Sequence, residues 1–294
     1  MASTQNSVQI INALVFSIDN PRHFVTVGKG HVRNWFIEEE RNCRHVIRNS
    51  TPDGQISKKL INNAVFINAN DYLVSHGNFI SKITAALQSS SNNNKNSQQQ
   101  QQQQQQSSKS RVKFSMKSLD KGMGDVKNFT SFASDRKRNL IFCGAENGTI
   151  QVVDLNLKPA TISGYLPKPH RIDDLLMEKH QPSVSVDGHC YPDVLALAFV
   201  DDNLLVACYS DHSMYIWKVD AVFSKAQVFY KQFFHPCRIF DADVYPNCNS
   251  PIYQDDTFAT SSNDGTIRIW SFQNQRMVSP TSLLGFFLIF KFNF

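Results

Sequence analysis

The sequence predicts an all-β fold built from a repeated unit, and two observations support this prediction. A tight turn followed by a strand of alternating apolar residues recurs five times along the chain, and three of these strands end in tryptophan. Alternation of this kind is typical of strands with one buried face. A unit that recurs at intervals of roughly 40–50 residues and ends in tryptophan indicates the blades of a β-propeller. The corresponding turn positions are Gly30, Gly77, Gly148, His212 and Gly265.

The first two units are expected within residues 8–88. In the first unit we expect strands at 15–20, 23–27 and 32–36, followed by a polar loop that runs to about residue 53. The second unit lacks a tryptophan, and its strands are predicted at 64–67, 72–74 and 79–87.

An insert at residues 89–111 has a different composition from the rest of the chain. It is rich in Ser, Asn and Gln and contains an uninterrupted glutamine run at 98–106. Because it has almost nothing apolar to bury, the insert cannot offset the entropy lost on ordering, and we expect it to be disordered. A surface loop between strands or between blades is its natural place.

The remaining three units are expected within residues 112–275. The fourth unit, with strands at 194–199, 204–208 and 214–217, shows the clearest alternation. Residues 276–294 form an atypical apolar tail, which fits an interfacial anchor, a final strand or the end of a truncated array. The other predicted strands are 129–133, 139–144, 149–154 and 161–165 in the third unit, and 239–244, 257–261 and 266–272 in the fifth.

Eight residues are candidates for a structural motif that pins the turns. His189 stands 28 residues before Trp217, a spacing that suits a buried hydrogen-bond relay from a histidine through a hydroxyl to a turn aspartate. Such a relay satisfies buried polar groups and does not require catalysis. The candidates are His189, Ser210, Asp211 and Trp217 in the fourth unit, His235, Asp264 and Trp270 in the fifth, and Trp35 in the first.

Composition and motifs argue against most classes of chemistry. The formal net charge of +5 is spread along the chain without the aromatic residues of a nucleic-acid surface. The six cysteines form no CxxC pair, and no zinc-ligand spacing, phosphate-binding loop or nucleophile elbow is present. We therefore expect no enzyme activity, no cofactor, no metal and no nucleic-acid or membrane partner. The polar N-terminus lacks a signal peptide, which favours a reducing, cytoplasmic compartment. Cys143 and Cys208 fall in predicted strands and are expected to be buried.

Several segments resemble WD-repeat propellers, and more narrowly the family of mitogen-activated protein kinase-binding protein 1 and WD repeat-containing protein 62. They are FVTVG at 24–28, HVRNWF at 31–36, LPKPH at 166–170, DHSMYIW at 211–217 and DVYP at 243–246. The LPKPH segment is the most specific, because blade geometry does not require it.

The resemblance implies an intracellular, non-catalytic scaffold that binds proteins. It links the chain to c-Jun N-terminal kinase signalling, and to spindle poles, centrosomes and the cytoskeleton. Members of the family have more repeats, arranged in two propellers, and a long C-terminal region with kinase docking that this sequence lacks, so an incomplete or truncated array is expected. The alternatives are a microtubule-associated WD-repeat protein of another family, or a truncated product without function.

Overall fold

The computed structural model shows that the chain folds into small antiparallel sheets. All the regular elements in its described part are strands, which confirms the all-β prediction. No helix in this part is long and apolar enough to cross a membrane. The structure describes residues 10–17, 19–39, 45–50, 60–87, 112–118, 126–160, 170–171, 189–201, 203–219, 227–233, 235–244, 257–272, 274 and 276–277.

Five sheets follow one another in chain order, each formed by strands that pair with their sequence neighbours. We number them from the N-terminus as the first to the fifth sheet, and a short two-stranded ladder of β12 (His170–Arg171) and β13 (His189–Cys190) lies outside them. The first sheet contains β1 (Ile11–Phe16), β2 (His23–Gly28), β3 (His31–Glu39) and β4 (His45–Ser50). The second contains β5 (Ala64–Phe66), β6 (Asp71–His76), β7 (Phe79–Leu87) and β8 (Val112–Ser118). The third contains β9 (Phe129–Asp135), β10 (Leu140–Ala145) and β11 (Ile150–Asp154). The fourth contains β14 (Val194–Asp201), β15 (Leu204–Tyr209), β16 (Ser213–Lys218) and β17 (Gln227–Phe233). The fifth contains β18 (Ile239–Val244), β19 (Thr257–Ser262), β20 (Ile267–Ser271) and β21 (Arg276–Met277).

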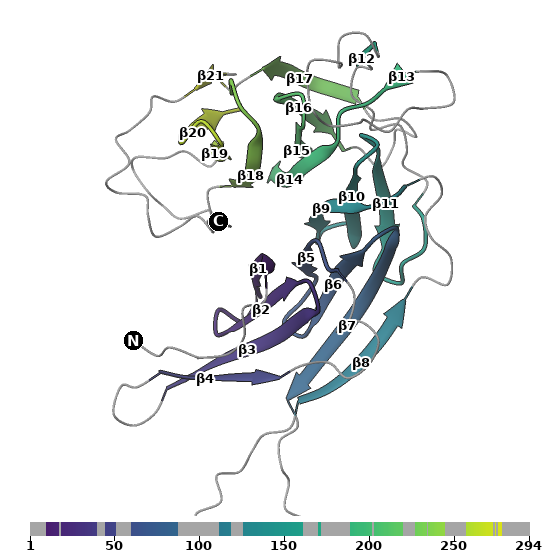
Figure 1. The fold of residues 1–294 in the computed structure, drawn as a ribbon, viewed down its shortest axis with the longest axis vertical. Coiled ribbons are helices and arrows are strands. Elements are labelled where there is room, and N and C mark those ends of the chain that lie inside the picture. Colours follow the sequence, from purple (N-terminus) through teal and green to yellow (C-terminus); the bar gives the residue numbers. More distant parts are fainter. Residues whose placement is uncertain are drawn as a thin grey trace, which may run out of the picture.

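The five sheets stack as propeller blades along an arc. Figure 1 shows the first and fifth sheets at the two ends of this arc, with the first strand of each sheet turned toward its inner side. Successive first strands contact one another, from β1 to β5, β9, β14 and β18. Four buried apolar clusters hold the arc together, and each cluster joins two consecutive sheets. The predicted blade architecture is therefore confirmed.

The turn between the second and third strands of each sheet has the same backbone conformation in all five sheets. The five turn positions that the sequence aligns have φ between 62° and 77°. Glycine adopts this left-handed region without strain, whereas His212 is the only one of the five with a side chain. The predicted alignment of the repeats is thus correct at the turn position that requires a left-handed backbone.

The fourth strands of the first, second, fourth and fifth sheets were not predicted. The segment expected to be a polar loop after residue 36 contains β4, which pairs with β3 along its length. Strand β17 pairs with β16 in the same way. Among the described strands, each of the two has a neighbour on one side only, and such edge strands carry polar residues that mask the strand pattern.

The glutamine-rich insert connects two strands of one sheet. Strand β7 ends and β8 begins with the pair Leu87 and Val112, which are neighbours in the second sheet. Residues 88–111 themselves lie outside the described residues, as do the strand predicted at 161–165 and the tail after Met277. The insert therefore belongs to a hairpin within a blade, one of the two places that the sequence allowed.

Candidate functional site

The fifth sheet contains a relay of buried hydrogen bonds at its second turn. Trp270 Nε1 lies 2.9 Å from Thr260 Oγ1, which lies 2.8 Å from His235 Nε2. His235 Nδ1 in turn lies 3.1 Å from Asp264 Oδ2. Thr260 is fully buried and His235 is nearly so. The structure thus brings together the three residues that the sequence selected in this unit, and it adds Thr260 as the hydroxyl between them.

The chemistry of the groups sets the direction of this relay. A carboxylate only accepts, so His235 donates through Nδ1 to Asp264 and its Nε2 is left to accept from the Thr260 hydroxyl. The Thr260 oxygen then accepts from the Trp270 indole. Burial lowers the pKa of His235 below its usual value, although the hydrogen bond to Asp264 partly opposes this shift. The relay therefore holds a neutral histidine.

Asp264 joins the relay to the turn itself. Its Oδ1 accepts from the backbone N–H of Thr266 at 2.8 Å and from the Thr266 hydroxyl at 2.6 Å. Burial would raise the pKa of Asp264, but the hydrogen bonds from Thr266 and His235 hold that pKa at about 2. The carboxylate is thus charged at neutral pH and fixes the left-handed turn at Gly265.

The first sheet repeats the same hydroxyl-centred arrangement with a different histidine. Trp35 Nε1 donates to Thr26 Oγ1 at 2.8 Å, and His31 Nε2 lies 2.7 Å from the same oxygen. All three residues are buried. His31 lies next to the turn, whereas His235 precedes its sheet. Histidines from different positions of the repeat therefore contact the corresponding threonine oxygen in the two sheets.

In the fourth sheet the predicted residues are near one another, but their bonds run differently. Asp211 Oδ1 accepts from the Ser213 N–H and hydroxyl, while Trp217 Nε1 donates to Tyr209 OH at 3.2 Å. Ser210 Oγ accepts from the N–H of Asp193 at 2.9 Å. The side chain of His189 lies outside the described residues, so its role in this sheet stays a prediction.

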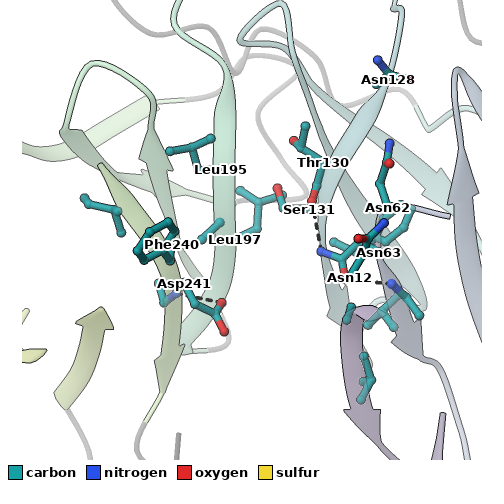
Figure 2. A pocket seen from close by; sticks show the side chains of 18 of the residues that line it. Asn12, Asn62, Asn63, Asn128, Thr130, Ser131, Leu195, Leu197, Phe240 and Asp241 are labelled. Atoms are coloured by element: carbon teal, nitrogen blue, oxygen red, sulfur yellow. Dashed lines mark hydrogen bonds between the residues drawn. The ribbon is translucent and has the colours of Figure 1, made fainter. Parts of the chain in front are cut away.

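A central cavity of about 570 Å³ opens between the five sheets. It is lined by residues from the first strand of every sheet. Figure 2 shows the amides of Asn12, Asn62 and Asn63 on the side of the first and second sheets, facing Leu197 and Phe240 from the fourth and fifth. Its lining is thus polar on one side and partly apolar on the other.

Hydrogen bonds between neighbouring sheets fix the asparagines of the cavity wall. Asn12 Nδ2 donates to the carbonyl oxygen of Ile61 at 2.7 Å, and Asn63 Nδ2 donates to that of Thr130 at 3.0 Å. Two large apolar side chains, Leu60 and Phe240, line the same cavity and are each 54% exposed. A rigid wall with exposed apolar residues is suited to binding another molecule.

Charged groups gather where the third, fourth and fifth sheets meet this cavity. Glu146 and Arg238 line it, and Asp193 precedes β14. Burial, with a smaller contribution from the charge of Glu146, raises the pKa of Asp193 to about 6, while Arg238 opposes that shift. Glu146 is further held by Asn128 Nδ2, which donates to Oε2 at 2.8 Å.

These side chains do not assemble a site for metal chemistry. Within the described ranges, no group of three or more His, Cys, Asp or Glu side chains is placed to hold an ion. Cys143 and Cys208 are fully buried, as predicted, and burial raises the pKa of both thiols.

Sequence reasoning missed Thr26, Thr260 and Tyr209. Each lies in the second strand of its sheet, on the face that bears the tryptophan. An alignment of the second strands exposes the shared position of Thr26 and Thr260, whereas Ala207 takes that position in the fourth sheet and Tyr209 lies two residues beyond it. The cavity lining gave no comparable signal, because its residues come from all five sheets.

Comparison with known proteins agrees with this geometry. The WD40 family (WD domain, G-beta repeat) matches residues 180–218 and 233–271, which contain β13 to β16 and most of the fifth sheet. Mitogen-activated protein kinase-binding protein 1 from Homo sapiens is 24% identical over 284 residues, which cover 92% of this chain and 17% of the relative. WD repeat-containing protein 62 from Sus scrofa is 25% identical over 277 residues, which cover 92% of this chain and 16% of the relative.

The chain therefore spans about one sixth of the length of these curated relatives. The mouse form of WD repeat-containing protein 62 gives a similar match, at 26% identity over 282 residues. The predicted resemblance is confirmed: the chain carries WD repeats and is similar along nearly its whole length to a part of mitogen-activated protein kinase-binding protein 1 and WD repeat-containing protein 62.

Proposed function

We propose that the chain is a non-catalytic scaffold that binds a protein partner at its central cavity. The observation that supports this proposal most directly is the cavity wall, where exposed Leu60 and Phe240 lie among amides and carboxylates on rigid strands. Apolar anchors surrounded by polar groups are the usual composition of a protein-binding surface. The relay residues buried between the sheets keep this wall rigid and do not themselves contact the partner.

The partner that we propose is a component of the mitogen-activated protein kinase pathway. The name of one relative, mitogen-activated protein kinase-binding protein 1, states that the relative binds such a kinase. We propose the c-Jun N-terminal kinase branch and a cytoplasmic location, with spindle poles or centrosomes as the place of action. These finer assignments depend on relatives that are far longer than this chain.

A direct binding measurement tests the proposal. Purified c-Jun N-terminal kinase is titrated against the immobilised chain, against Phe240→Asp and against Val228→Asp. Val228 is 49% exposed on β17 and does not line the cavity, so its variant adds the same charge at a matched position elsewhere. We expect Phe240→Asp to weaken binding about tenfold or more and Val228→Asp to change it little.

Two outcomes would contradict the proposal. If the unmodified chain does not bind the kinase, the pathway assignment is wrong. If both variants bind as well as the unmodified chain, the cavity is not the binding surface. Co-sedimentation with microtubules, measured on the same variants, separates the kinase partner from a microtubule-associated role.

A further inference from the structure

The central cavity carries a charge opposite in sign to that of the whole chain. Among the described residues, its lining contains three carboxylates and one guanidinium, namely Glu146, Asp241, Asp243 and Arg238. The chain as a whole has a formal net charge of +5. The lining therefore attracts a cationic ligand, whereas the net charge of the molecule attracts an anionic one.

Strand geometry places two of these carboxylates side by side on β18. Ala242 is buried in the cluster that joins the fourth and fifth sheets. Because side chains alternate along a strand, Asp241 and Asp243 share the opposite face, where both are exposed and line the cavity. Figure 2 shows the Asp241 carboxylate close to the Phe240 ring. In each aspartate, Oδ1 accepts from the backbone N–H of the following residue at 2.9 Å, which fixes the carboxylate on the strand.

The wall on the other side of the cavity adds hydrogen-bond acceptors. Asn12 Nδ2 donates to the carbonyl oxygen of Ile61 at 2.7 Å, and Asn62 Nδ2 donates to that of Phe129 at 3.4 Å. A carbonyl only accepts, so each amide must turn its nitrogen toward that carbonyl and its oxygen away. Among the described residues, neither amide oxygen has a hydrogen-bond donor. The oxygens are therefore the groups that these two amides offer to a ligand.

The single cation of the lining lies near other acidic groups. Arg238 and Glu146 both act on the pKa of Asp193, which Arg238 lowers and Glu146 raises. One guanidinium and one lining carboxylate thus lie near Asp193, just before β14, and their charges offset each other. The net charge of the lining therefore comes from Asp241 and Asp243.

Apolar side chains lie beside these acceptors. Leu197 and Phe240 line the cavity on the side of the aspartates, and Phe240 is 54% exposed. A long cationic side chain can place its apolar stem on such residues while its charged end donates to the oxygens. Arginine fits best, because its five N–H donors lie in one plane, it has no acceptor to satisfy, and it stacks on aromatic rings.

We propose that the partner segment that enters the central cavity carries an arginine next to an apolar residue. The guanidinium donates to the carboxylates of Asp241 and Asp243, and the apolar neighbour packs on Phe240 and Leu197. The inference rests on the proposed function, because it assigns the chemistry of the ligand to the same cavity. An acidic segment is disfavoured there, although the positive net charge of the chain attracts it.

Binding of short capped peptides to the full chain tests the inference. Leucine alternates with arginine in one fluorescent peptide, with glutamine in a second and with glutamate in a third, and fluorescence anisotropy measures each affinity. We expect the arginine peptide to bind about tenfold or more tightly than the glutamine peptide, and the glutamate peptide to bind most weakly. Attraction by the net charge alone predicts the reverse order.

Single variants then locate the charge that is recognised. Asp241→Asn and Asp243→Asn keep an oxygen for the backbone N–H and remove the charge, so each should weaken the arginine peptide about threefold to tenfold and leave the glutamine peptide unchanged. Arg238→Gln should strengthen the arginine peptide about twofold or more. The matched control is Asp154→Asn on β11, since Asp154 also accepts backbone N–H groups but does not line the cavity. It should change neither affinity.

One further variant separates this inference from the proposed function. Phe240→Ala removes an apolar contact that all three peptides share, so it should weaken all three. If it does so while Asp241→Asn and Asp243→Asn leave the arginine peptide unchanged, the cavity binds the ligand but does not recognise a cation. The kinase titration tests the pathway assignment independently of these peptides.

Four other results would overturn the inference. The arginine peptide could bind no more tightly than the glutamine peptide, or none of the peptides could bind. Arg238→Gln could weaken the arginine peptide, which would mean that the cavity favours an anionic group. Asp154→Asn could weaken that peptide as much as Asp241→Asn does, which would mean that the attraction is not specific to the cavity.

Discussion

Replacement of Thr260 by valine tests the reasoning on the buried relay most sharply. Valine has nearly the shape of threonine, so the change removes the hydroxyl with little effect on packing. Two hydrogen bonds are lost, those from Trp270 Nε1 and to His235 Nε2, and both partner atoms stay buried. Each buried polar group left without a partner costs about 1–3 kcal/mol, so for the two groups we expect Thr260→Val to lower the free energy of unfolding by about 2–6 kcal/mol.

Urea denaturation followed by tryptophan fluorescence measures this loss, provided that the slope with denaturant stays constant. Thr266→Val is the matched control, because the Thr266 backbone N–H keeps its bond to Asp264 when the hydroxyl is removed. We expect this control to cost about 1 kcal/mol or less. If Thr260→Val costs no more than Thr266→Val, the relay does not stabilise the fifth sheet.

Three further predictions concern pH, backbone strain and packing. Burial lowers the pKa of His23, His31 and His235, so below about pH 6.5 the folded state binds fewer protons than the unfolded state. The free energy of unfolding should therefore be highest above that pH and fall as the pH drops toward 5. Urea titrations with a constant slope that show no such fall would contradict this prediction. His212 has φ 66°, and Gly265 has φ 77° with open space around it. In thermal unfolding, His212→Gly should be neutral or stabilising by up to about 1 kcal/mol, whereas Gly265→Ala should be destabilising by about 1–2 kcal/mol. Equal effects of the two substitutions would count against backbone strain. The hydroxyl of Ser131 is buried without a hydrogen-bond partner among the described residues, so Ser131→Ala should leave the unfolding midpoint unchanged or raise it, and a clear loss of stability would show that the hydroxyl has a role.

The inner three strands of the sheets could be predicted because they are paired on both sides or line the core. In the fourth sheet, for example, β15 is flanked by β14 and β16, and its residues are buried on both faces. Such a strand cannot tolerate charge, so its apolar pattern survives in the sequence. Among the described strands, β4 and β17 have a neighbour on one side only, and their mixture of charged and apolar residues resembles a loop.

The candidate site could be predicted only in its local part. Asp264 and Trp270 stand in one turn and the strand that follows it, so their spacing is fixed by hairpin geometry. Thr260 joins them only through the register between β19 and β20, and His235 precedes the fifth sheet altogether. Tyr209 replaces the expected serine as the partner of Trp217 because its side chain lies on the same face of the sheet.

The sequence alone determined the all-β class, the five repeats and the residues that must take a left-handed turn, because each follows from interactions between residues close along the chain. Tertiary structure decided which faces are covered, which hydroxyl completes each relay and how Leu60 and Phe240 come to line one cavity. Those contacts join residues far apart in sequence, and their geometry depends on how each sheet packs on the next.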